Sequence, residues 1–243
     1  MTDTTKQPGW NLRVSYLCLE QSQVGSAAYA HLKGFFDEWP DGSLIVTRST
    51  HHSGDSLGSK ATSIMAAFGR YALTLARANT VGARAHPMVF PGILLGRLTG
   101  KRTFLFLQGR PSDLPSNSLG YRVLGWISAA SFKGSIRCSD VVFATSEGLA
   151  RWARSQSRAT VIQVTNGVAV ERFPWPVPHK SGVVFVGTPA PWQGLSTLLD
   201  AAASPNWPTN IAVTVIGVSA DDRCGAAGAN VKFLGRLTPP EVA

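Results

Sequence analysis

The sequence predicts an α/β protein made of two domains of the same type, each built around a parallel sheet. Strand-like and helix-like stretches alternate along its 243 residues, which is the pattern of parallel sheets covered by helices. Three prolines within residues 174–178 interrupt the alternation, because proline continues neither a helix nor a central strand. The alternation then restarts. The expected organisation is a disordered tail at 1–9, a first domain at 10–173, a linker at 174–181 and a second domain at 182–243.

Local patterns justify each element in turn. Residues 12–19 form an apolar run after a polar tail and are expected to form the first strand. Across 60–78, apolar residues recur every three or four positions, which is helical spacing. Residues 103–107 are continuously apolar, as in a strand covered on both faces. The other elements expected in the first domain are helices at 27–37, 89–98, 121–132 and 149–155 and strands at 44–47, 141–145 and 160–164. In the second domain we expect strands at 183–186, 211–216 and 231–234 and a helix at 195–203.

Composition sets the broad class of the protein. Hydrophobic residues make up 44% of the chain, which suffices for a buried core and excludes a disordered or fibrous protein. Lys and Arg number 23 against 14 Asp and Glu, so the net charge is +9. This charge suits an anionic partner: nucleic acid, an acidic membrane surface or a phosphorylated small molecule. No recognisable nucleic-acid-binding motif is present, so nucleic acid is not an expected partner.

The cysteines and the apolar segments indicate the compartment. Cys18, Cys138 and Cys224 are odd in number and far apart, which argues against a disulfide framework or a zinc site. The N-terminus lacks the apolar core of a signal peptide, and proline and basic residues interrupt the longest apolar region, 88–107. We therefore expect a cytoplasmic protein that is soluble or peripheral at the inner face of the plasma membrane.

Two loops between a strand and a helix are candidates for phosphate binding. In open parallel sheets, ligands bind beyond the carboxyl ends of the strands, where helix N-termini offer free N–H groups. Loop 20–26 contains Gly25, and loop 187–194 has Gly187 and Gly194 at its ends. Neither matches the dinucleotide-binding G-x-G-x-x-G pattern or a P-loop. From spacing alone, an ordinary turn explains these loops equally well.

Several short segments, taken in order, carry a resemblance to a known family. Val164-Thr165-Asn166-Gly167-Val168, followed by Phe173, resembles the "NGV…F" signature of the family-4 retaining glycosyltransferases. Ser139-Asp140-Val141-Val142 with Ser146-Glu147 resembles the "aD-x-v…S" segment of that family. Further matches are Val184-Phe185-Val186-Gly187 with Trp192-Gln193-Gly194 and Leu198-Leu199-Asp200-Ala201, the strand Val231-Lys232-Phe233-Leu234-Gly235, and, as in some members, Arg84-Ala85-His86-Pro87.

The resemblance implies a GT-B fold, in which two Rossmann-like domains face each other across a cleft. It implies a nucleotide-sugar donor on the C-terminal domain and a glycan or lipid-linked acceptor on the N-terminal domain. The diphosphate would lie at the glycine loop of the second domain, with the Gly25 turn approaching from the other side. Catalysis would be electrostatic, with retention of configuration. No metal or other cofactor is expected, because the family usually needs none and the chain has no D-x-D motif.

The chain departs from the family pattern at several site positions. Thr188 and Gln193 stand where the family usually has basic residues facing the diphosphate, and Gln108 stands where a histidine often follows the strand. His86 is the nearest substitute for that histidine and the candidate catalytic residue; a structural histidine is the alternative. Arg84, Gln108 and Arg110 are candidates for contact with the acceptor or a phosphate, and the alternative for the arginines is a solvated surface.

Positive charge is concentrated in residues 82–138, which contain eight basic residues and one acid, Asp113. Interleaved aromatic residues make this region a candidate for peripheral contact with an anionic membrane. Charge that only favours solubility is the alternative. The basic residues are Arg84, Arg97, Lys101, Arg102, Arg110, Arg122, Lys133 and Arg137, and the aromatic ones are Phe104, Phe106, Trp126 and Phe132.

A serine hydrolase is a distant alternative. Gly54-Asp55-Ser56-Leu57-Gly58 matches G-x-S-x-G, and Asp140 and His179 follow in the hydrolase order. That mechanism needs the serine on a sharp turn directly after a strand, and the polar residues 49–53 intervene here.

The last residues of the chain indicate how much of a second domain is expected. Thr238-Pro239-Pro240-Glu241 has the residues of a helix start, yet only two residues follow. In the family, the donor domain continues through further strand–helix units. We therefore expect 182–243 to be the first part of a donor domain, whose small sheet leaves an edge and a face uncovered. A non-catalytic, truncated glycosyltransferase is the alternative to an active one.

Overall fold

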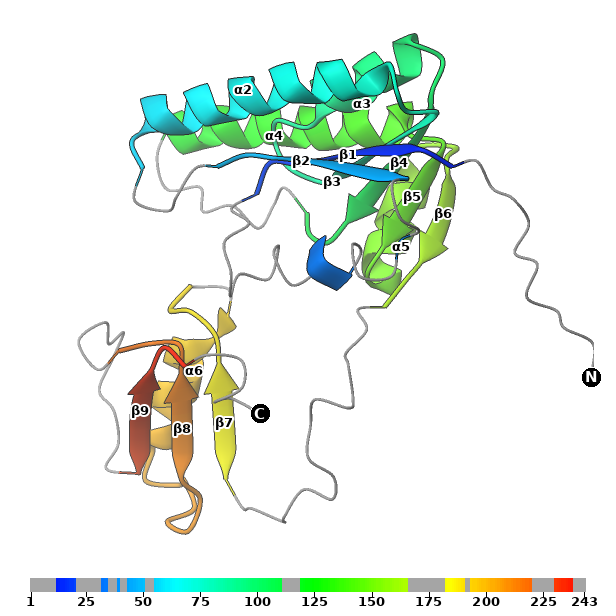
Figure 1. Ribbon diagram of the computed structural model, residues 1–243. Helices are drawn as coiled ribbons and strands as arrows, with labels where there is room; N and C mark the ends of the chain where they lie inside the picture. Colours follow the sequence, from blue (N-terminus) through cyan, green and yellow to red (C-terminus); the bar gives the residue numbers. More distant parts are fainter. Residues whose placement is uncertain are drawn as a thin grey trace, which may run out of the picture. The chain divides into compact units, whose positions relative to one another are not determined.

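The chain forms two compact units, residues 1–166 and 167–243, in the computed structural model (Figure 1). The structure describes residues 12–20, 32–34, 39, 43–50, 55–110, 119–165, 182–190, 193–219 and 230–237; for 57 and 119–124 it describes the backbone alone. The predicted linker at 174–181 lies outside the described residues, as does most of the predicted helix at 27–37, of which residues 32–34 are helical.

The first unit contains a six-stranded, all-parallel sheet with the strand order β2-β1-β3-β4-β5-β6. Its described helices are α2 (Leu57–Leu75), α3 (Phe90–Leu98), α4 (Leu119–Cys138) and α5 (Glu147–Gln156). The strands are β1 (Val14–Cys18), β2 (Leu44–Arg48), β3 (Thr80–Arg84), β4 (Arg102–Leu107), β5 (Val141–Ala144) and β6 (Thr160–Gln163). The predicted elements are confirmed to within a few residues, except that α4 is longer than predicted at both ends and β3 was not predicted at all.

Both faces of the central strands β1, β3 and β4 are buried, as the continuous apolar run in β4 predicted, whereas the edge strand β6 is largely exposed. Helices α2, α3 and α4 lie over one face, as Figure 1 shows, and α5 packs into the same core. The opposite face carries a second cluster that includes Tyr16, Leu32 and Phe104. Because side chains alternate along a strand, Leu17 faces the helices while Tyr16 and Cys18 face this second cluster. A ligand can therefore reach these central strands only at their ends.

Strand β3 shows why its sequence, Thr-Val-Gly-Ala-Arg, escaped prediction. Tyr16, Gly82 and Phe104 are neighbours across three strands. The Phe104 ring lies over Gly82, where a Cβ would be 2.1 Å from the ring, and its centroid is 6.0 Å from that of Tyr16. Glycine is therefore required at position 82 so that the aromatic rings on either side can meet. It is also a poor strand former, so the pattern of the strand is lost.

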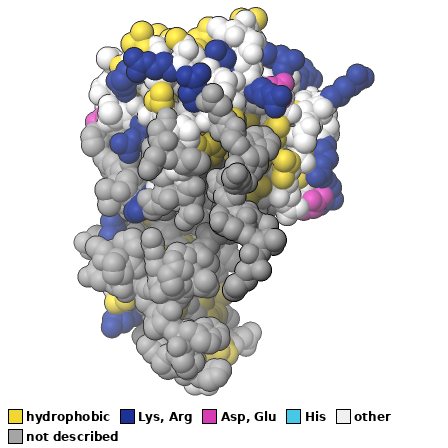
Figure 2. Space-filling model, turned by 45° about the vertical axis from the view of Figure 1, so that its right-hand side comes forward, with side chains coloured by type: hydrophobic (Ala, Val, Ile, Leu, Met, Phe, Trp, Pro, Cys, Tyr) yellow, Lys and Arg dark blue, Asp and Glu magenta, His cyan; other side chains and the backbone are white. Residues whose placement is uncertain are grey.

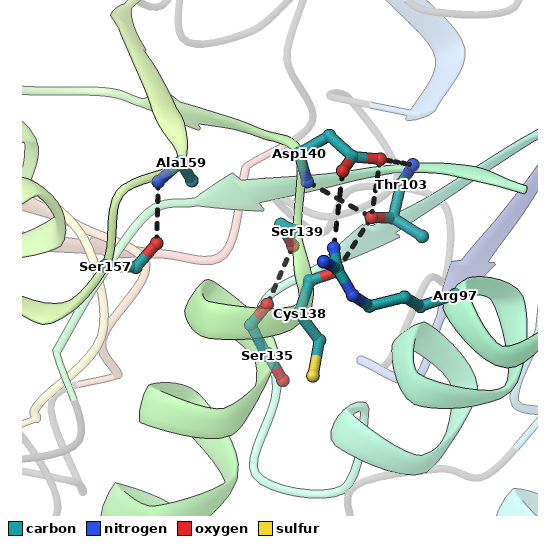
Figure 3. Close-up of polar contacts among 8 residues, drawn as sticks. All are labelled: Arg97, Thr103, Ser135, Cys138, Ser139, Asp140, Ser157 and Ala159. Carbon is teal, nitrogen blue, oxygen red and sulfur yellow. Dashed lines mark hydrogen bonds and ion pairs between the residues drawn. The ribbon is translucent and has the colours of Figure 1, made fainter.

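At the amino ends of the strands, Asp140 ties together α3, β4, α4 and β5 (Figure 3). Its carboxylate accepts hydrogen bonds from the Thr103 N–H at 2.8 Å and from Arg97 at 3.3 Å. The Thr103 hydroxyl donates to the carbonyl of Cys138 at 2.8 Å. Asp140 belongs to the "aD-x-v" segment, so this part of the resemblance corresponds to a structural junction.

The second unit has a three-stranded parallel sheet in the order β7-β8-β9, with helix α6 packed on it. Its elements are β7 (Val183–Val186), α6 (Leu195–Ala202), β8 (Val213–Ile216) and β9 (Val231–Gly235), close to those predicted. Val184 and Val186 are 63% and 59% exposed. The prediction that this sheet leaves a face uncovered is confirmed for β7. In the described part of the chain, no helix is both long and apolar enough to span a bilayer.

Candidate functional site

The candidate site of the first unit lies at the carboxyl ends of β1, β3 and β4. β1 is flanked by β2 on one side and β3 on the other, so the strand order reverses there, and ligands bind at such a switch point beyond the strand ends. The residues that follow these strands are polar: Glu20 after β1, His86 after β3, and Gln108 and Arg110 after β4. Arg84, the last residue of β3, is among them.

Glu20 and Arg84 form an ion pair at this switch point. The Nε of Arg84 donates to a Glu20 carboxylate oxygen at 2.6 Å, and Arg84 is only 6% exposed. The same guanidinium has a buried nitrogen, Nη1, with no hydrogen-bond partner among the described residues. A buried donor without a partner is costly, and a ligand or an ordered water at the site is one way in which its cost is met. Because Arg84 is buried, the alternative of a solvated surface arginine is excluded for this residue.

Burial around this pair also acts on its neighbours on the same face. Burial, with a contribution from the Glu20 carboxylate, raises the pKa of the Cys18 thiol to about 11. Burial raises the pKa of the Tyr16 hydroxyl as well. Both side chains are uncharged at neutral pH, so Cys18 is not a reactive thiolate. The pair therefore lies near two buried, uncharged side chains, while a third of the Glu20 side chain is exposed.

His86, Gln108 and Arg110 lie at the same edge of the sheet. The Nδ1 of His86 accepts the backbone N–H of Met88 at 3.2 Å, so neutral His86 carries its proton on Nε2. Arg110 is exposed; it donates to the carbonyl of Gly148 at 3.1 Å and lies over the Trp152 ring at 5.7 Å from the centroid. Gln108 is half-buried. The fold thus brings four of the predicted residues together with Glu20, which sequence analysis had not singled out.

The glycine loop of the second unit follows β7 and ends at α6. Gly194 caps the helix with φ 73°, a left-handed conformation that favours glycine. The first hydrogen bond of the helix runs from the Leu198 N–H to the Gly194 carbonyl, so the N–H groups of residues 195–197 precede it. They are the donors expected to face an anion at this end of α6.

Gln193 folds back over this loop. Its Oε1 accepts the N–H of Thr188 at 2.8 Å, and a Cβ at position 187 would lie 2.1 Å from the same oxygen. Glycine at 187 therefore makes room for the Gln193 side chain. Thr188 and Gln193, the two residues that replace the basic pair of the family, bond to each other across the loop.

Other predicted positions are separate from these sites or outside the described residues. Gly25, the "NGV" segment and His179 lie outside them. Ser56 caps α2 by accepting the Ser59 N–H at 3.3 Å. Asp140 precedes β5, at the strand edge opposite to the one that α2 begins from, so the geometry does not support a triad of Ser56 and Asp140. Within the described residues, no group of three or more His, Cys, Asp or Glu side chains could hold a metal ion.

Three solved structures illustrate which known proteins share the fold of this chain. HepE from Anabaena, in complex with UDP, has a TM-score of 0.62 at 14% identity, covering 95% of this chain and 71% of HepE. Sucrose-phosphate synthase from Thermosynechococcus elongatus has a TM-score of 0.65 at 13% identity, covering 95% and 72%. The lipopolysaccharide outer core galactosyltransferase WaaB has a TM-score of 0.56 at 11% identity, covering 95% and 70%.

These likenesses establish the fold. The chain is α/β and GT-B-like, with Rossmann-like parallel sheets in both units, as predicted. No protein-family model matches the chain, and no curated protein matches it by sequence.

Proposed function

We propose that this chain is a glycosyltransferase that moves a sugar from a nucleotide-sugar donor to a glycan or lipid-linked acceptor, with retention of configuration. The observation that carries the proposal is that the fold of HepE and WaaB extends over 95% of the chain, across both units. HepE is in complex with UDP, and WaaB is a galactosyltransferase. The ordered segments that resemble family-4 retaining glycosyltransferases support the same assignment.

We assign the donor diphosphate to the loop between β7 and α6. Gly187, Thr188, Gln193 and Gly194 form the loop, and the helix offers its first N–H groups to the phosphate oxygens. The Gly25 turn is the second proposed contact. Because no basic side chain stands at 188 or 193, affinity for the diphosphate rests on N–H groups and on the Gln193 amide, and it is expected to be modest.

We assign the acceptor to the carboxyl edge of the first sheet, with Arg84, Gln108 and Arg110 in contact with acceptor hydroxyl or phosphate groups. In the transfer, the acceptor hydroxyl oxygen bonds to the anomeric carbon as the bond from that carbon to the diphosphate oxygen breaks. The hydroxyl proton passes to the departing nucleoside diphosphate. His86 is the candidate catalytic residue, because the Nε2 proton of its neutral form can donate a hydrogen bond to the reacting groups.

Nucleotide binding tests the proposal. We expect UDP, GDP or ADP to bind the intact chain in isothermal titration calorimetry, and the matching nucleotide-sugar to be consumed when an acceptor is supplied. Gly187→Val should weaken binding, because even a Cβ at 187 would displace the Gln193 side chain that accepts the Thr188 N–H. Gly69→Ala is the matched control, since a Cβ at Gly69 has nothing within 4 Å. Circular dichroism checks that both variants fold.

Each outcome has a distinct meaning. If none of the three nucleotides binds with a Kd below about 1 mM, the proposal is contradicted. Binding without turnover with any acceptor would favour the non-catalytic alternative. Unchanged turnover in excess EDTA is expected, since we propose no metal. Gln193→Lys restores the family residue and should tighten nucleotide binding, by about threefold to tenfold for one charge-assisted contact.

A further inference from the structure

The helices α2, α3 and α4 carry no acidic residue at all. None of the 19, 9 and 20 residues of these helices is Asp or Glu, whereas α5 contains Glu147 and α6 contains Asp200. The three helices lie side by side on one face of the first sheet (Figure 1). We call them the helical layer. Its basic residues are Lys60, Arg70, Arg97, Arg122, Lys133 and Arg137. Two of them serve the amino end of the sheet: Arg97 pairs with Asp140, and Arg137 donates to the carbonyl of Gln156 at 3.2 Å.

The outer side of the helical layer also exposes large hydrophobic side chains. Trp126 on α4 is 83% exposed, Leu73 on α2 is 78% exposed and Leu98 on α3 is 76% exposed. Met65 on α2 and Ile127 on α4 are exposed too. Since the inner sides of these helices pack on the sheet, the exposed residues lie on the outer side.

The exposed residues follow helical stripes. On α2, Met65 and Leu73 lie two turns apart, with exposed Gly69 between them. On α4, the exposed residues Trp126, Ala130 and Lys133 lie four and then three positions apart on one side. In the coloured part of the face that Figure 2 draws, lysine and arginine side chains are interspersed with hydrophobic ones, and acidic side chains are few.

Three of the four aromatic residues that pointed to a membrane surface in the sequence are core residues. Phe104, Phe106 and Phe132 are 9%, 5% and 7% exposed, so they cannot contact a bilayer. Trp126 is the aromatic residue of that group that does reach the surface. The structure moves the candidate surface from residues 82–138 as a whole to the outer side of three helices, one of which, α2, precedes that segment.

We propose that the outer side of the helical layer docks on a bilayer that contains anionic lipids. Trp126, Leu73 and Leu98 enter the boundary between headgroups and acyl chains, while the exposed basic residues Arg70 and Lys133 contact lipid phosphates. The combination of exposed apolar side chains with basic residues and no acidic ones is that of an interfacial membrane surface. Each basic residue near such a surface strengthens binding by about 1 kcal/mol, or roughly fivefold.

Charge distinguishes this partner from two others. A second copy of the chain would bring two basic, acid-free layers together, which is unfavourable. A nucleic acid would use the basic residues and leave exposed Leu73 and Leu98 without a role. An anionic bilayer satisfies both kinds of side chain.

Vesicle sedimentation tests the proposal on the intact chain. We expect binding to vesicles of 70% phosphatidylcholine and 30% phosphatidylglycerol at 0.1 M NaCl, and weak binding to pure phosphatidylcholine vesicles or in 0.5 M NaCl. Trp126→Ala should weaken binding at least about tenfold. Leu73→Ser, at a site on another helix, should weaken it as well and gives an independent variant. Both side chains are exposed, so the melting temperature should stay within about 2 °C of the wild type.

A matched pair of double variants separates this surface from net charge. Arg70→Gln with Lys133→Gln removes two charges from exposed positions on α2 and α4 of the helical layer, and should weaken binding about 25-fold. Lys232→Gln with Arg236→Gln removes two charges from exposed positions in the second unit and should change binding less than about threefold.

Three results would overturn the proposal. They are no binding to the anionic vesicles at 0.1 M NaCl, equal losses in the two double variants, or a dimer in analytical ultracentrifugation that Trp126→Ala dissociates. Vesicle binding does not depend on nucleotide binding. A chain that binds vesicles but no nucleotide would refute the proposed function and leave this inference standing.

Discussion

The two ends of the first sheet both carry an arginine paired with a carboxylate, and the pairs differ in every other respect. At the amino end, the Arg97–Asp140 pair spans 3.3 Å, both side chains are about half exposed, and Asp140 also holds Thr103. At the carboxyl end, the Arg84–Glu20 pair spans 2.6 Å, Arg84 is buried, and its Nη1 has no partner among the described residues.

The difference separates structure from function. Both carboxylate oxygens of Asp140 have donors, and these bonds close the junction between α3, β4 and β5. At the other end, the Nη1 of Arg84 has no acceptor among the described residues, and it lies at the switch point where ligands bind. A carboxylate–guanidinium pair therefore does not by itself indicate a ligand site. The hydrogen bonds made by its other nitrogen and oxygen atoms decide whether any of them is available to a ligand.

The amino-end junction should carry the larger share of stability. Asp140→Ala leaves the buried N–H of Thr103 without its acceptor and should lower the free energy of unfolding by about 2 kcal/mol. Urea denaturation measures the loss. Arg97→Gln, which breaks only the half-exposed pair, should cost less than about 1 kcal/mol. If Arg97→Gln cost as much as Asp140→Ala, the ion pair and not the contact with Thr103 would be the main contribution.

The carboxyl-end pair should show the opposite balance. Arg84→Met keeps the length and apolar stem of the side chain and removes the unpartnered nitrogen. It also leaves Glu20 without its partner, but a third of the Glu20 side chain is exposed to water, so the free energy of unfolding should fall by only about 1 to 2 kcal/mol. Transfer to the acceptor should fall at least about tenfold, with nucleotide affinity unchanged. Initial rates and calorimetry with the same donor measure both. A loss of stability with normal transfer would make Arg84 a structural residue like Asp140.

A smaller effect of pH should come from the buried thiol beside Glu20. The pKa of Cys18 is raised from 9.0 to about 11, so above pH 9 the unfolded chain loses a proton that the folded chain keeps. Stability therefore falls as pH rises from 9 towards 11, by about 1 kcal/mol at pH 10. Tyr16 and Tyr71, whose pKa burial also raises, act in the same direction from pH 10 upwards.

Melting temperatures measured from pH 8 to pH 10 check this prediction. Cys18→Ala should have a flatter profile than the wild type between pH 9 and pH 10. Cys138→Ala is the control, because Cys138 is only partly buried, and it should keep the wild-type slope. Equal slopes in all three proteins would show that Cys18 is not the group responsible.

Sequence patterns predicted the fold better than the site. Strand β4 and helix α2 were predicted because a continuous apolar run and a helical spacing of apolar residues each indicate which side chains are buried. β3 was missed because Gly82 serves the Phe104 ring of a neighbouring strand, which is a tertiary requirement. Glu20 was missed for the same reason: only when β3 is placed beside β1 do Glu20 and Arg84 meet. An acidic residue directly after the first strand was the signal available.

The strand order also bears on how the chain folds while it is being synthesised. β1 and β2 emerge first, but β1 needs β3 on its other side, and β3 is made only after the whole of α2. Until Thr80–Arg84 has left the ribosome, β1 keeps an unpaired, apolar edge that invites aggregation. From β4 onwards, each new strand of this sheet pairs with the one made just before it. The nascent chain is therefore most in need of a chaperone before residue 84, and less so for the rest of the first unit.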